Sequence, residues 1–447
     1  MVKVITYGTY DLLHYGHIRL LERAKELGDY LIVGVTAEDF DKTRGKINVQ
    51  QSLMERVEAV RATGIADEII IEEYEGQKID DIKRYDVDIF TVGSDWEGHF
   101  DYLREYCKVV YLDRTQGISS SQLRTTRRGL SVGIVGHNAL LNKFAKESTY
   151  VNGLTVVGVC TANEAVKEEL KEQEVICYDE YEKMLENVDA VYVATLPKDH
   201  YSQIKKALEQ DKHVIFEAPL ALTKEQSEEL FELAKTKNLI LMDAIKTAYS
   251  TAYSRLLLLA KTGAIGDIVS VDATCTSLRE IETEKSDSQR QNSICAWGPT
   301  GLLPVFQLLG TNYNSRHIVS WLKDGSEDFD IFTKIDFIYP GAVATVKVAK
   351  GVKSEGELII SGTKGYIYVP APWWKTDYFE IRFEQTDRNK RYFYQLDGEG
   401  IRYELVIFLK SIEKGKDLSN IEQSISNEIT SVVEDLVINK NYTKLTV

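Results

Sequence analysis

The chain has 447 residues, of which 43% are hydrophobic and 28% are charged, a composition typical of a water-soluble globular protein with two or three domains. Its net charge of −15 at pH 7 argues against a surface that binds nucleic acid or an anionic membrane. No apolar run is long enough to span a bilayer and no signal segment opens the sequence, so we expect no membrane insertion and a cytoplasmic location. The five cysteines lack Cys-x-x-Cys spacing and predict neither a disulfide framework nor a zinc site.

The first 129 residues alternate β-branched apolar runs with amphipathic stretches. This is the βαβ rhythm of a parallel, doubly wound α/β sheet. We expect strands at 3–7, 30–35, 68–72, 88–92 and 108–112, and helices near 17–27, 50–62, 78–84, 99–106 and 119–126.

The first strand runs into a small turn and then into a His-x-Gly-His sequence. His14 and His17 stand three residues apart where the next helix begins. A helix N-terminus after a strand and a glycine turn suits anions, because backbone N–H groups and the helix dipole point to one place. Two imidazoles there can donate to phosphate oxygens without a metal, which favours nucleotidyl transfer. The binding residues expected in this segment are Gly8, Thr9, Tyr10, Asp11 and Gly16.

Two further segments follow later strands of this domain. Asp95 and Trp96 come directly after the fourth strand and are expected to bind substrate, although Trp96 also fits a place in the core. An Arg-Thr-x-Gly-Ile-Ser sequence begins at Arg114. A guanidinium suits a phosphate, and Ser119 offers a hydroxyl N-cap to the last helix. Lys46, in an Arg-Gly-Lys loop, is either a mobile cation for phosphates or a solvated loop lysine. The binding residues expected after Arg114 are Thr115, Gly117, Ile118, Ser119 and Ser120.

On these motifs the domain resembles the cytidylyltransferase family that carries the His-x-Gly-His signature. The resemblance covers residues 1–129 and implies a Rossmann-like nucleotidyltransferase fold. It implies that His14 and His17 are catalytic and stabilise the transition state at the α-phosphate of CTP. Lys46 and Arg114 are the other catalytic residues that it implies.

The same resemblance implies how the nucleotide is held. Arg114, Thr115 and Ser119 would bind the triphosphate and the cytidine, and Mg²⁺ would bridge the leaving phosphates. Asp11 either helps to place that metal or caps the turn before the first histidine. One departure is Gln116, since family members usually carry Glu there.

A second βαβ series begins at Leu130, with strands expected at 131–135, 156–160, 188–194, 212–216 and 239–242. From about residue 265 the polarity alternates, and we expect antiparallel strands at 266–276, 328–339, 342–349, 356–361 and 366–369, then a last helix at about 421–437. The sequence therefore predicts three domains: a nucleotidyltransferase domain at 1–129, a Rossmann dinucleotide-type domain at 130–250 and an α+β open-sheet domain at 251–447.

Three strings in the second half occur in a telling order: Val188 to Pro197, Lys212 to Pro219, and Gly263 to Gly266. On them the region from residue 130 onward resembles the Gfo/Idh/MocA family of sugar oxidoreductases. The resemblance implies a site for NAD(P)H in the Rossmann domain. The candidate cofactor-binding residues are Gly136, Thr161, Thr195, Pro197 and Glu217.

The dinucleotide fingerprint is degenerate in this region. Close approach of the pyrophosphate to the backbone favours three glycines, but Gly136 is followed by Asn138 and Leu141 at the other two positions. The acidic residue that would bind an NAD ribose is absent, and Thr161 stands after the second strand. A threonine tolerates a 2′-phosphate better than Asp does, but alone it does not indicate NADP.

The family's proton-handling residues are also replaced. Ala218 stands where the family has a lysine, and Ala296 and Thr300 align with its Asp and His. General acid–base catalysis of a hydride transfer then lacks its usual groups. Lys246, Tyr249 and His200 are candidate replacements, although each also fits a structural role. The second half is thus either a divergent reductase or a scaffold that kept the fold and lost the chemistry.

We therefore expect a cytidylyltransferase that joins CTP to a polyol phosphate or sugar phosphate, releasing pyrophosphate and a CDP-alcohol for teichoic acid or capsule synthesis. The acceptor is glycerol 3-phosphate or a longer alditol or ketose phosphate. Alternatives are a bifunctional cytidylyltransferase and NAD(P)H-dependent reductase, a non-catalytic sensor of CTP or a CDP-alcohol, and an adenylyl transferase. Both resemblances predict a homodimer.

Overall fold

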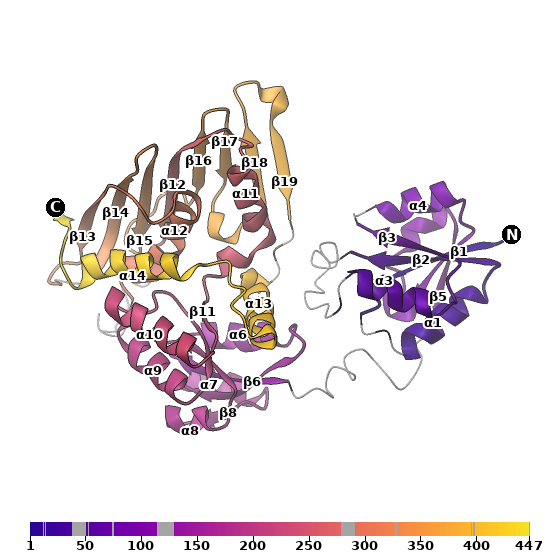
Figure 1. The fold of residues 1–447 in the computed structure, drawn as a ribbon, viewed down its shortest axis with the longest axis horizontal. Coiled ribbons are helices and arrows are strands. Elements are labelled where there is room, and N and C mark those ends of the chain that lie inside the picture. Colours follow the sequence, from indigo (N-terminus) through magenta and orange to yellow (C-terminus); the bar gives the residue numbers. More distant parts are fainter. Residues whose placement is uncertain are drawn as a thin grey trace. The chain divides into compact units, whose positions relative to one another are not determined.

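The structure is a computed structural model that describes residues 1–11, 13, 15–37, 51, 53–73, 76–113, 129–278, 291–326, 329–394, 396 and 398–446. It divides into two compact units, Met1–Gly129 and Leu130–Val447 (Figure 1). The further division of the second unit near residue 250 stays a prediction. None of the helices in the described parts combines the length and apolar content that crossing a bilayer requires.

In the described part of the first unit, five parallel strands are ordered β3-β2-β1-β4-β5. The strands are β1 (Lys3–Gly8), β2 (Tyr30–Thr36), β3 (Glu68–Glu72), β4 (Ile89–Gly93) and β5 (Lys108–Leu112). The helices are α1 (Tyr15–Lys25), α3 (Leu53–Ala62) and α4 (Gln77–Tyr85), with short 3₁₀ turns η1 (Ser94–Trp96) and η2 (Asp101–Glu105). Alternate residues of β1 face opposite sides of the sheet, so Val4 packs with α1 and α3 while Ile5 packs with α4 and η2.

The five strand predictions are confirmed to within one or two residues, but the helix expected at 99–106 is wrong. That segment is the 3₁₀ turn η2. Phe100 and Leu103, three residues apart, are both buried, and the Leu103 N–H donates to the Phe100 carbonyl at 3.0 Å. A 3₁₀ helix has three residues per turn, so it places both of these side chains on its buried face. Such a short turn is long enough to link the two strands. The helix expected at 119–126 lies outside the described residues.

The second unit opens with a Rossmann sheet whose six described strands, all parallel, are ordered β11-β10-β9-β6-β7-β8. They are β6 (Leu130–Gly136), β7 (Leu154–Cys160), β8 (Ile176–Tyr178), β9 (Ala190–Ala194), β10 (His213–Phe216) and β11 (Leu241–Asp243). The helices are α6 (Leu140–Ser148), α7 (Glu164–Lys171), α8 (Tyr181–Leu185), α9 (Pro197–Glu209) and α10 (Lys224–Thr236). The predicted α/β class and its parallel sheet are confirmed.

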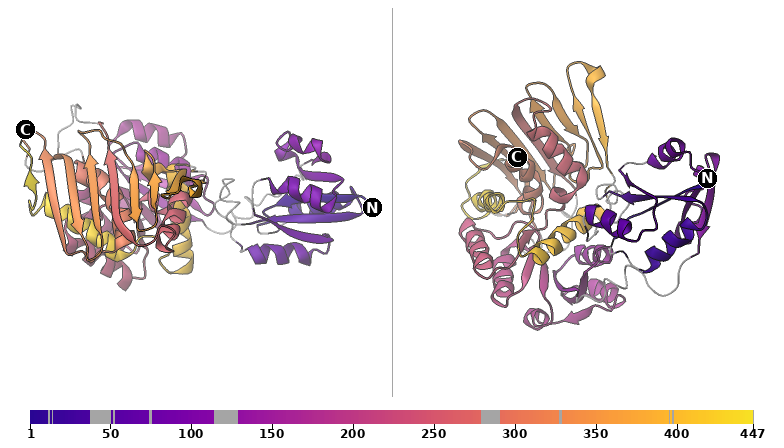
Figure 2. Two further views of the ribbon diagram at one scale, coloured as in Figure 1. Left: turned by 90° about the horizontal axis from the view of Figure 1, so that it is seen from above. Right: turned by 45° about the vertical axis from the view of Figure 1, so that its right-hand side comes forward.

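A larger sheet follows, and its nine described strands are ordered β19-β18-β17-β16-β12-β15-β14-β13-β20 (Figure 2). They are β12 (Ile268–Thr276), β13 (Ser315–Leu322), β14 (Asp330–Ile338), β15 (Val343–Ala349), β16 (Leu358–Gly362), β17 (Tyr366–Val369), β18 (Tyr378–Arg382), β19 (Lys390–Phe393) and β20 (Thr443–Lys444). The other described elements are α11 (Thr251–Lys261), α12 (Ser293–Leu309), α13 (Ile401–Lys414), α14 (Gln423–Val437) and the 3₁₀ turns η3 (Lys246–Tyr249), η5 (Trp373–Lys375), η6 (Thr386–Arg388) and η7 (Gly398–Gly400).

The expectation that all strands of this sheet are antiparallel is wrong, because β12 pairs with β15 in parallel. Between these two strands the chain passes through α12 and the β13–β14 hairpin. A parallel pair needs a crossover of that kind. Gly301 of α12 lies close against the strands, since a Cβ there would be 2.8 Å from Val346 of β15.

Candidate functional site

The first unit has described residues of two predicted segments at the carboxyl edge of its sheet. β1 and β4 are neighbours, whereas the chain after β1 first forms β2 on its other side. Such a switch point is where open α/β sheets bind ligands. The segment from Gly8 to His17 leaves β1 there, and η1 with Trp96 leaves the adjacent β4. The two segments predicted as one site therefore share one sheet edge.

The turn after β1 is built from buried residues. Thr9 and Asp11 are buried, and Tyr10, 1% exposed, has a φ of 52° in the left-handed region. A Cβ added at Gly8 would lie 3.0 Å from the Tyr10 ring, so that position favours glycine. The Asp11 Oδ1 accepts the Gln51 N–H at 3.0 Å. These contacts fix the path of the chain toward α1.

Arg56 of α3 is fully buried and holds this turn in place through hydrogen bonds. Its Nη1 donates to the Thr9 carbonyl at 2.8 Å and to the Thr36 carbonyl at 2.8 Å, while its Nε donates to the Gln51 carbonyl at 3.1 Å. One guanidinium thus ties together the ends of β1 and β2. Sequence reasoning missed this residue. The sequence offers no signal for it, because only the structure shows that Arg56 shares the buried side of α3 with Val57 and Val60.

His17 and Gly16 lie in the first turn of α1, as expected. The His17 ring meets the Tyr10 ring edge-on, with centroids 5.6 Å apart. Trp96 is 37% exposed, and its ring lies 5.5 Å from that of His99. The predicted residues His14, Lys46, Arg114, Thr115, Gly117, Ile118, Ser119 and Ser120 lie outside the described residues, as does the side chain of Asp95.

Asp11 is the carboxylate predicted to help place a metal ion. Among the described residues, no group of three or more His, Cys, Asp or Glu is arranged to hold one. Mg²⁺ in nucleotide sites commonly takes one or two protein carboxylates and completes its shell with phosphates and water. Asp11 as a ligand of such an ion stays a prediction, since its side chain is buried and its Oδ1 already accepts the Gln51 N–H.

The five cofactor candidates of the second unit share the carboxyl edge of the Rossmann sheet. Gly136 ends β6 and Thr161 follows β7, while Glu217 follows β10. Thr195 follows β9, and Pro197 is the first residue of α9. β6 and β9 are neighbours at the switch point of this sheet, and the role of these five residues in cofactor binding stays a prediction.

The local contacts at this edge do not fit a dinucleotide held in the standard way. The Asn138 Oδ1 accepts the Leu140 N–H at 2.9 Å, so a side chain occupies a donor at the start of α6. Leu141 is fully buried. The Thr161 hydroxyl accepts the Asn163 N–H at 3.1 Å within its own turn. A Cβ at Gly136 would lie 2.6 Å from the Ala194 carbonyl oxygen, which accounts for this glycine by strand packing alone.

Two interacting carboxyl groups belong to this region: that of Glu217, which is partly buried, and that of Glu404, which is buried. The Tyr192 hydroxyl donates to Glu217 Oε1 at 2.5 Å, and the ring of Tyr192 stacks on Phe144 with centroids 3.9 Å apart. Burial raises the pKa of Glu217. Glu404 lies in α13, and burial together with the Glu217 charge raises its pKa well above the ordinary value. The charge of Lys246 opposes this rise in the pKa of both carboxyl groups but does not cancel it.

The three candidate replacements for the missing acid–base residues differ in their surroundings. His200 is buried, with its ring nitrogens 2.8 Å from the Pro219 carbonyl and 3.2 Å from the Thr195 carbonyl. The Tyr249 hydroxyl donates to the Asp243 carbonyl at 2.9 Å. Lys246 alone of the three has a partly exposed charged end, 26% by its side chain, near those two carboxyl groups. Sequence reasoning missed Glu404. The hydrophobic pattern of an amphipathic helix does not show which groups lie next to a buried carboxyl group.

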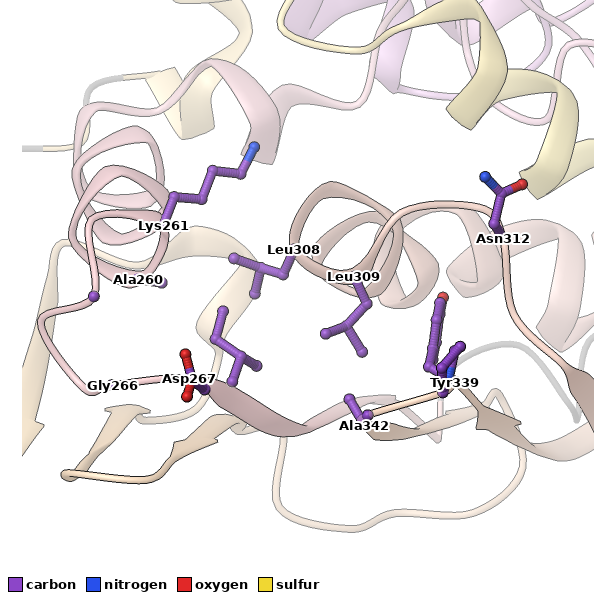
Figure 3. Close-up of a pocket in the computed structure, with 13 residues that line it drawn as sticks. Ala260, Lys261, Gly266, Asp267, Leu308, Leu309, Asn312, Tyr339 and Ala342 are labelled. Atoms are coloured by element: carbon purple, nitrogen blue, oxygen red, sulfur yellow. The ribbon is translucent and has the colours of Figure 1, made fainter.

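A pocket of about 550 Å³ opens elsewhere in the second unit, where α11 and α12 end and β12 begins (Figure 3). Leu308 and Leu309 of α12 line it, with Lys261, Asp267 and Asn312 as its polar groups. The Tyr339 hydroxyl donates to the Gly310 carbonyl rather than into this space. The pocket contains none of the predicted site residues.

Comparisons with known proteins match each unit separately. Residues 5–126 match the family model described as cytidylyltransferase-like, and residues 130–244 match the oxidoreductase family with an NAD-binding Rossmann fold. The glycerol-3-phosphate cytidylyltransferase of Bacillus spizizenii is 50% identical over 124 residues, which cover 28% of this chain and 95% of that enzyme. The Staphylococcus aureus enzyme of the same name is 48% identical over 128 residues, 28% of this chain and 93% of that enzyme.

Solved structures share the fold of the second unit. KijD10, a 3-ketoreductase from Actinomadura kijaniata solved with NADP and TDP-benzene, has a TM-score of 0.62 at 18% identity, covering 71% of this chain and 99% of that one. UDP-N-acetylglucosamine 3-dehydrogenase GnnA from Acidithiobacillus ferrooxidans has a TM-score of 0.59 at 16% identity, covering 69% and 97%. Through residues 5–126 the chain belongs to the cytidylyltransferase family, and it carries a second unit with a Gfo/Idh/MocA-type Rossmann domain.

Proposed function

We propose that the first unit transfers a cytidylyl group from CTP to a polyol phosphate or sugar phosphate, with pyrophosphate as the second product. The observation that carries this is the buried Gly8–Asp11 turn, which leads to His17 at the start of α1 and lies at the β1–β4 switch point. The 50% identity to a glycerol-3-phosphate cytidylyltransferase supports the same reaction. It also makes glycerol 3-phosphate the first acceptor to test, with longer alditol and ketose phosphates next.

The chemistry follows from the position of the helix. An acceptor phosphate oxygen attacks the α-phosphorus of CTP in line, a new P–O bond forms, and the bond to the bridging oxygen of the β-phosphate breaks. Negative charge develops on the oxygens around the α-phosphorus and on the departing pyrophosphate. His17, with His14, donates hydrogen bonds to these oxygens, and the N-terminal N–H groups of α1 add positive potential. Mg²⁺ supplies charge neutralisation at the leaving phosphates, and Asp11 is the residue that would hold it.

The test is pyrophosphate release by the full chain with CTP or ATP, Mg²⁺ and a panel of polyol and sugar phosphates. His17→Ala is expected to lower kcat by roughly 10²- to 10⁴-fold, because a positioned donor to the reacting phosphate is lost. His317→Ala, an exposed histidine of β13, is the control and should leave turnover unchanged. Full activity of His17→Ala would rule out this mechanism. Release from ATP but not CTP would favour an adenylyl transferase.

A second candidate function is reduction by NAD(P)H in the second unit, which the match of residues 130–244 to an NAD-binding oxidoreductase family favours. The filled donor at the start of α6 and the alanine at position 218 argue for altered chemistry instead. Titration with NADPH, followed by cofactor fluorescence, separates the two. Saturable binding with oxidation on a ketose phosphate would establish a bifunctional enzyme, whereas no binding would establish a scaffold.

We further propose that the protein works as a homodimer in the cytoplasm, where CTP is available, and that its product feeds the synthesis of teichoic acid or a capsule. The cytidylyltransferase relatives support a substrate pair of CTP and a phosphorylated alcohol. Exposed apolar residues on the large sheet support self-association. They include Ile338 and Val343, at 52% and 50% exposure, which face each other across β14 and β15.

A further inference from the structure

Glu399, in η7 at the start of α13, is surrounded by cations. Among the described residues three lysine side chains reach its carboxylate: Lys143 of α6 and Lys375 of η5 lie 3.2 and 2.7 Å from Oε1, and Lys246 of η3 lies 3.2 Å from Oε2. These lysines come from three separate parts of the chain. Three cations around one carboxylate leave an excess of positive charge at that point.

The surroundings of this lysine cluster (Lys143, Lys246 and Lys375) do not cancel the excess. Burial acts to raise the pKa of Glu399, but the hydrogen bond from Lys375 and the charge of Lys246 bring it down to about 2. Among the described residues, each of the three lysines forms its ion pair with Glu399, while Glu217 and Glu404 act on Lys246 only through longer-range electrostatics. The buried Glu404 Oε2 has no hydrogen-bond partner among the described groups.

Aromatic surface adjoins the cluster. Trp374, next to Lys375 in η5, packs against Trp297 of α12 with ring centroids 4.9 Å apart, and both rings are only partly buried. The Thr247 hydroxyl donates to the Trp374 carbonyl at 2.9 Å and so ties η3, which carries Lys246, to η5. Cationic side chains beside partly exposed aromatic rings form the combination that binds a nucleotide, with phosphates on the cations and a base against the rings.

We propose that the lysine cluster and the Trp297–Trp374 pair form a second nucleotide site, for a compound that carries a nucleoside diphosphate. The Glu399 carboxylate occupies the place of a phosphate and is displaced when the ligand binds. Glu399 is itself held at a φ of 56°, in the left-handed region, where a non-glycine residue is uncommon. A diphosphate suits the cluster because its two charged phosphates can each meet a lysine from a different part of the chain.

The identity of the compound that binds this second site rests on the function proposed for the first unit. That unit would release a CDP-alcohol, which carries a cytidine diphosphate and so has the required groups. A dinucleotide such as NADPH also contains a diphosphate and is the other source. In the first case the second unit binds the product of the first unit. In the second case it binds a dinucleotide through the same diphosphate group.

The test counts sites by calorimetric titration of the full chain with CDP-glycerol and, separately, with NADPH. Wild-type protein should bind two CDP-glycerol molecules per chain, one in each unit. Lys246→Met combined with Lys375→Met should weaken one site by about tenfold or more, because charge-assisted contacts to phosphate are lost. Lys205→Met is the matched control, since Lys205 has the same 36% side-chain exposure as Lys375 and pairs with Glu229 elsewhere.

Glu399→Gln is expected to change the affinity of the second site in the opposite direction. Loss of the competing carboxylate should tighten the second site by about threefold or more, whereas a purely structural Glu399 would leave binding unchanged or weaken it. A lysine-dependent NADPH site without a second CDP-glycerol site would support the diphosphate chemistry and assign its source to the dinucleotide. Sites that none of these substitutions affects, in variants whose melting temperatures match wild type, would overturn the proposal. Cytidylyl transfer by the same preparations reports on the first unit independently.

Discussion

At the scale of single residues, Arg56 determines the shape of the candidate active site without belonging to its motif. Its guanidinium is buried and bonds to the carbonyls of Thr9, Thr36 and Gln51. A lysine offers one point charge where three separated acceptors must be reached, so only arginine suits this position. The turn that delivers His17 to the switch point therefore depends on a residue from α3.

We expect Arg56→Met to lower the free energy of unfolding of the first unit by roughly 3 kcal/mol, because buried carbonyl groups lose their donor. Cytidylyl transfer should fall further than stability explains, since the turn after β1 loosens. Arg61→Met on the same helix is the control. Its Nη1 pairs with Glu58 at the surface, with 59% and 60% side-chain exposure, so it should change stability by less than about 0.5 kcal/mol. Urea denaturation and turnover measure both, and equal effects of the two variants would contradict the argument.

At the scale of elements, hydrophobic periodicity located most strands, because a parallel sheet buried on both faces needs continuous apolar runs such as Ala190 to Ala194. It could not distinguish β12 and β15 as a parallel pair, since alternation records which face is buried and not the direction of the neighbour. The site edges followed from strand ends. Arg56 and Glu399 were not predictable, because their partners are backbone carbonyls and lysines far away in sequence.

The packing of α14 on the Rossmann sheet gives a prediction on pH. Asp243 at the end of β11 is buried and accepts a hydrogen bond from Ser426 of α14. Burial raises its pKa from 3.8 to about 7, with Asp417 adding to the rise. Because the pKa of Asp243 is higher in the folded state than in the unfolded state, protonation of Asp243 stabilises the folded protein. This contribution to the free energy of unfolding is complete below about pH 4 and is lost as the pH rises toward 7.

Asp243→Asn should therefore gain stability relative to wild type as the pH is raised from 5 to 8, since the amide never ionises. Thermal unfolding of both proteins across this range measures the difference. Asp377→Asn, at an exposed position, should follow the wild-type curve. A difference between Asp243→Asn and wild type that stays constant with pH would show that Asp243 does not titrate in this range.

At the scale of the whole molecule, each unit places its candidate residues at a sheet edge where the strand order reverses. β1 and β4 form that point in the first unit, and β6 and β9 form it in the second. If the second unit binds a product of the first, the covalent link between them raises the effective concentration of that product for the second unit. In the second unit, lysines from α6, η3 and η5 meet at Glu399, whereas position 218 is an alanine.

Self-association is the property of the whole molecule that mutation tests most directly. If two chains pair through the large sheet, a charge placed at Ile338 or Val343 becomes buried without a partner, which costs several kcal/mol and should separate the chains. Light scattering should give twice the 50.8 kDa chain mass for wild type and the single mass for Ile338→Lys. Ile176→Lys is the control, because Ile176 is 57% exposed on β8, at the edge of the Rossmann sheet. A dimer that persists in Ile338→Lys and Val343→Lys would place the contact on another surface, and a monomeric wild type would refute the homodimer.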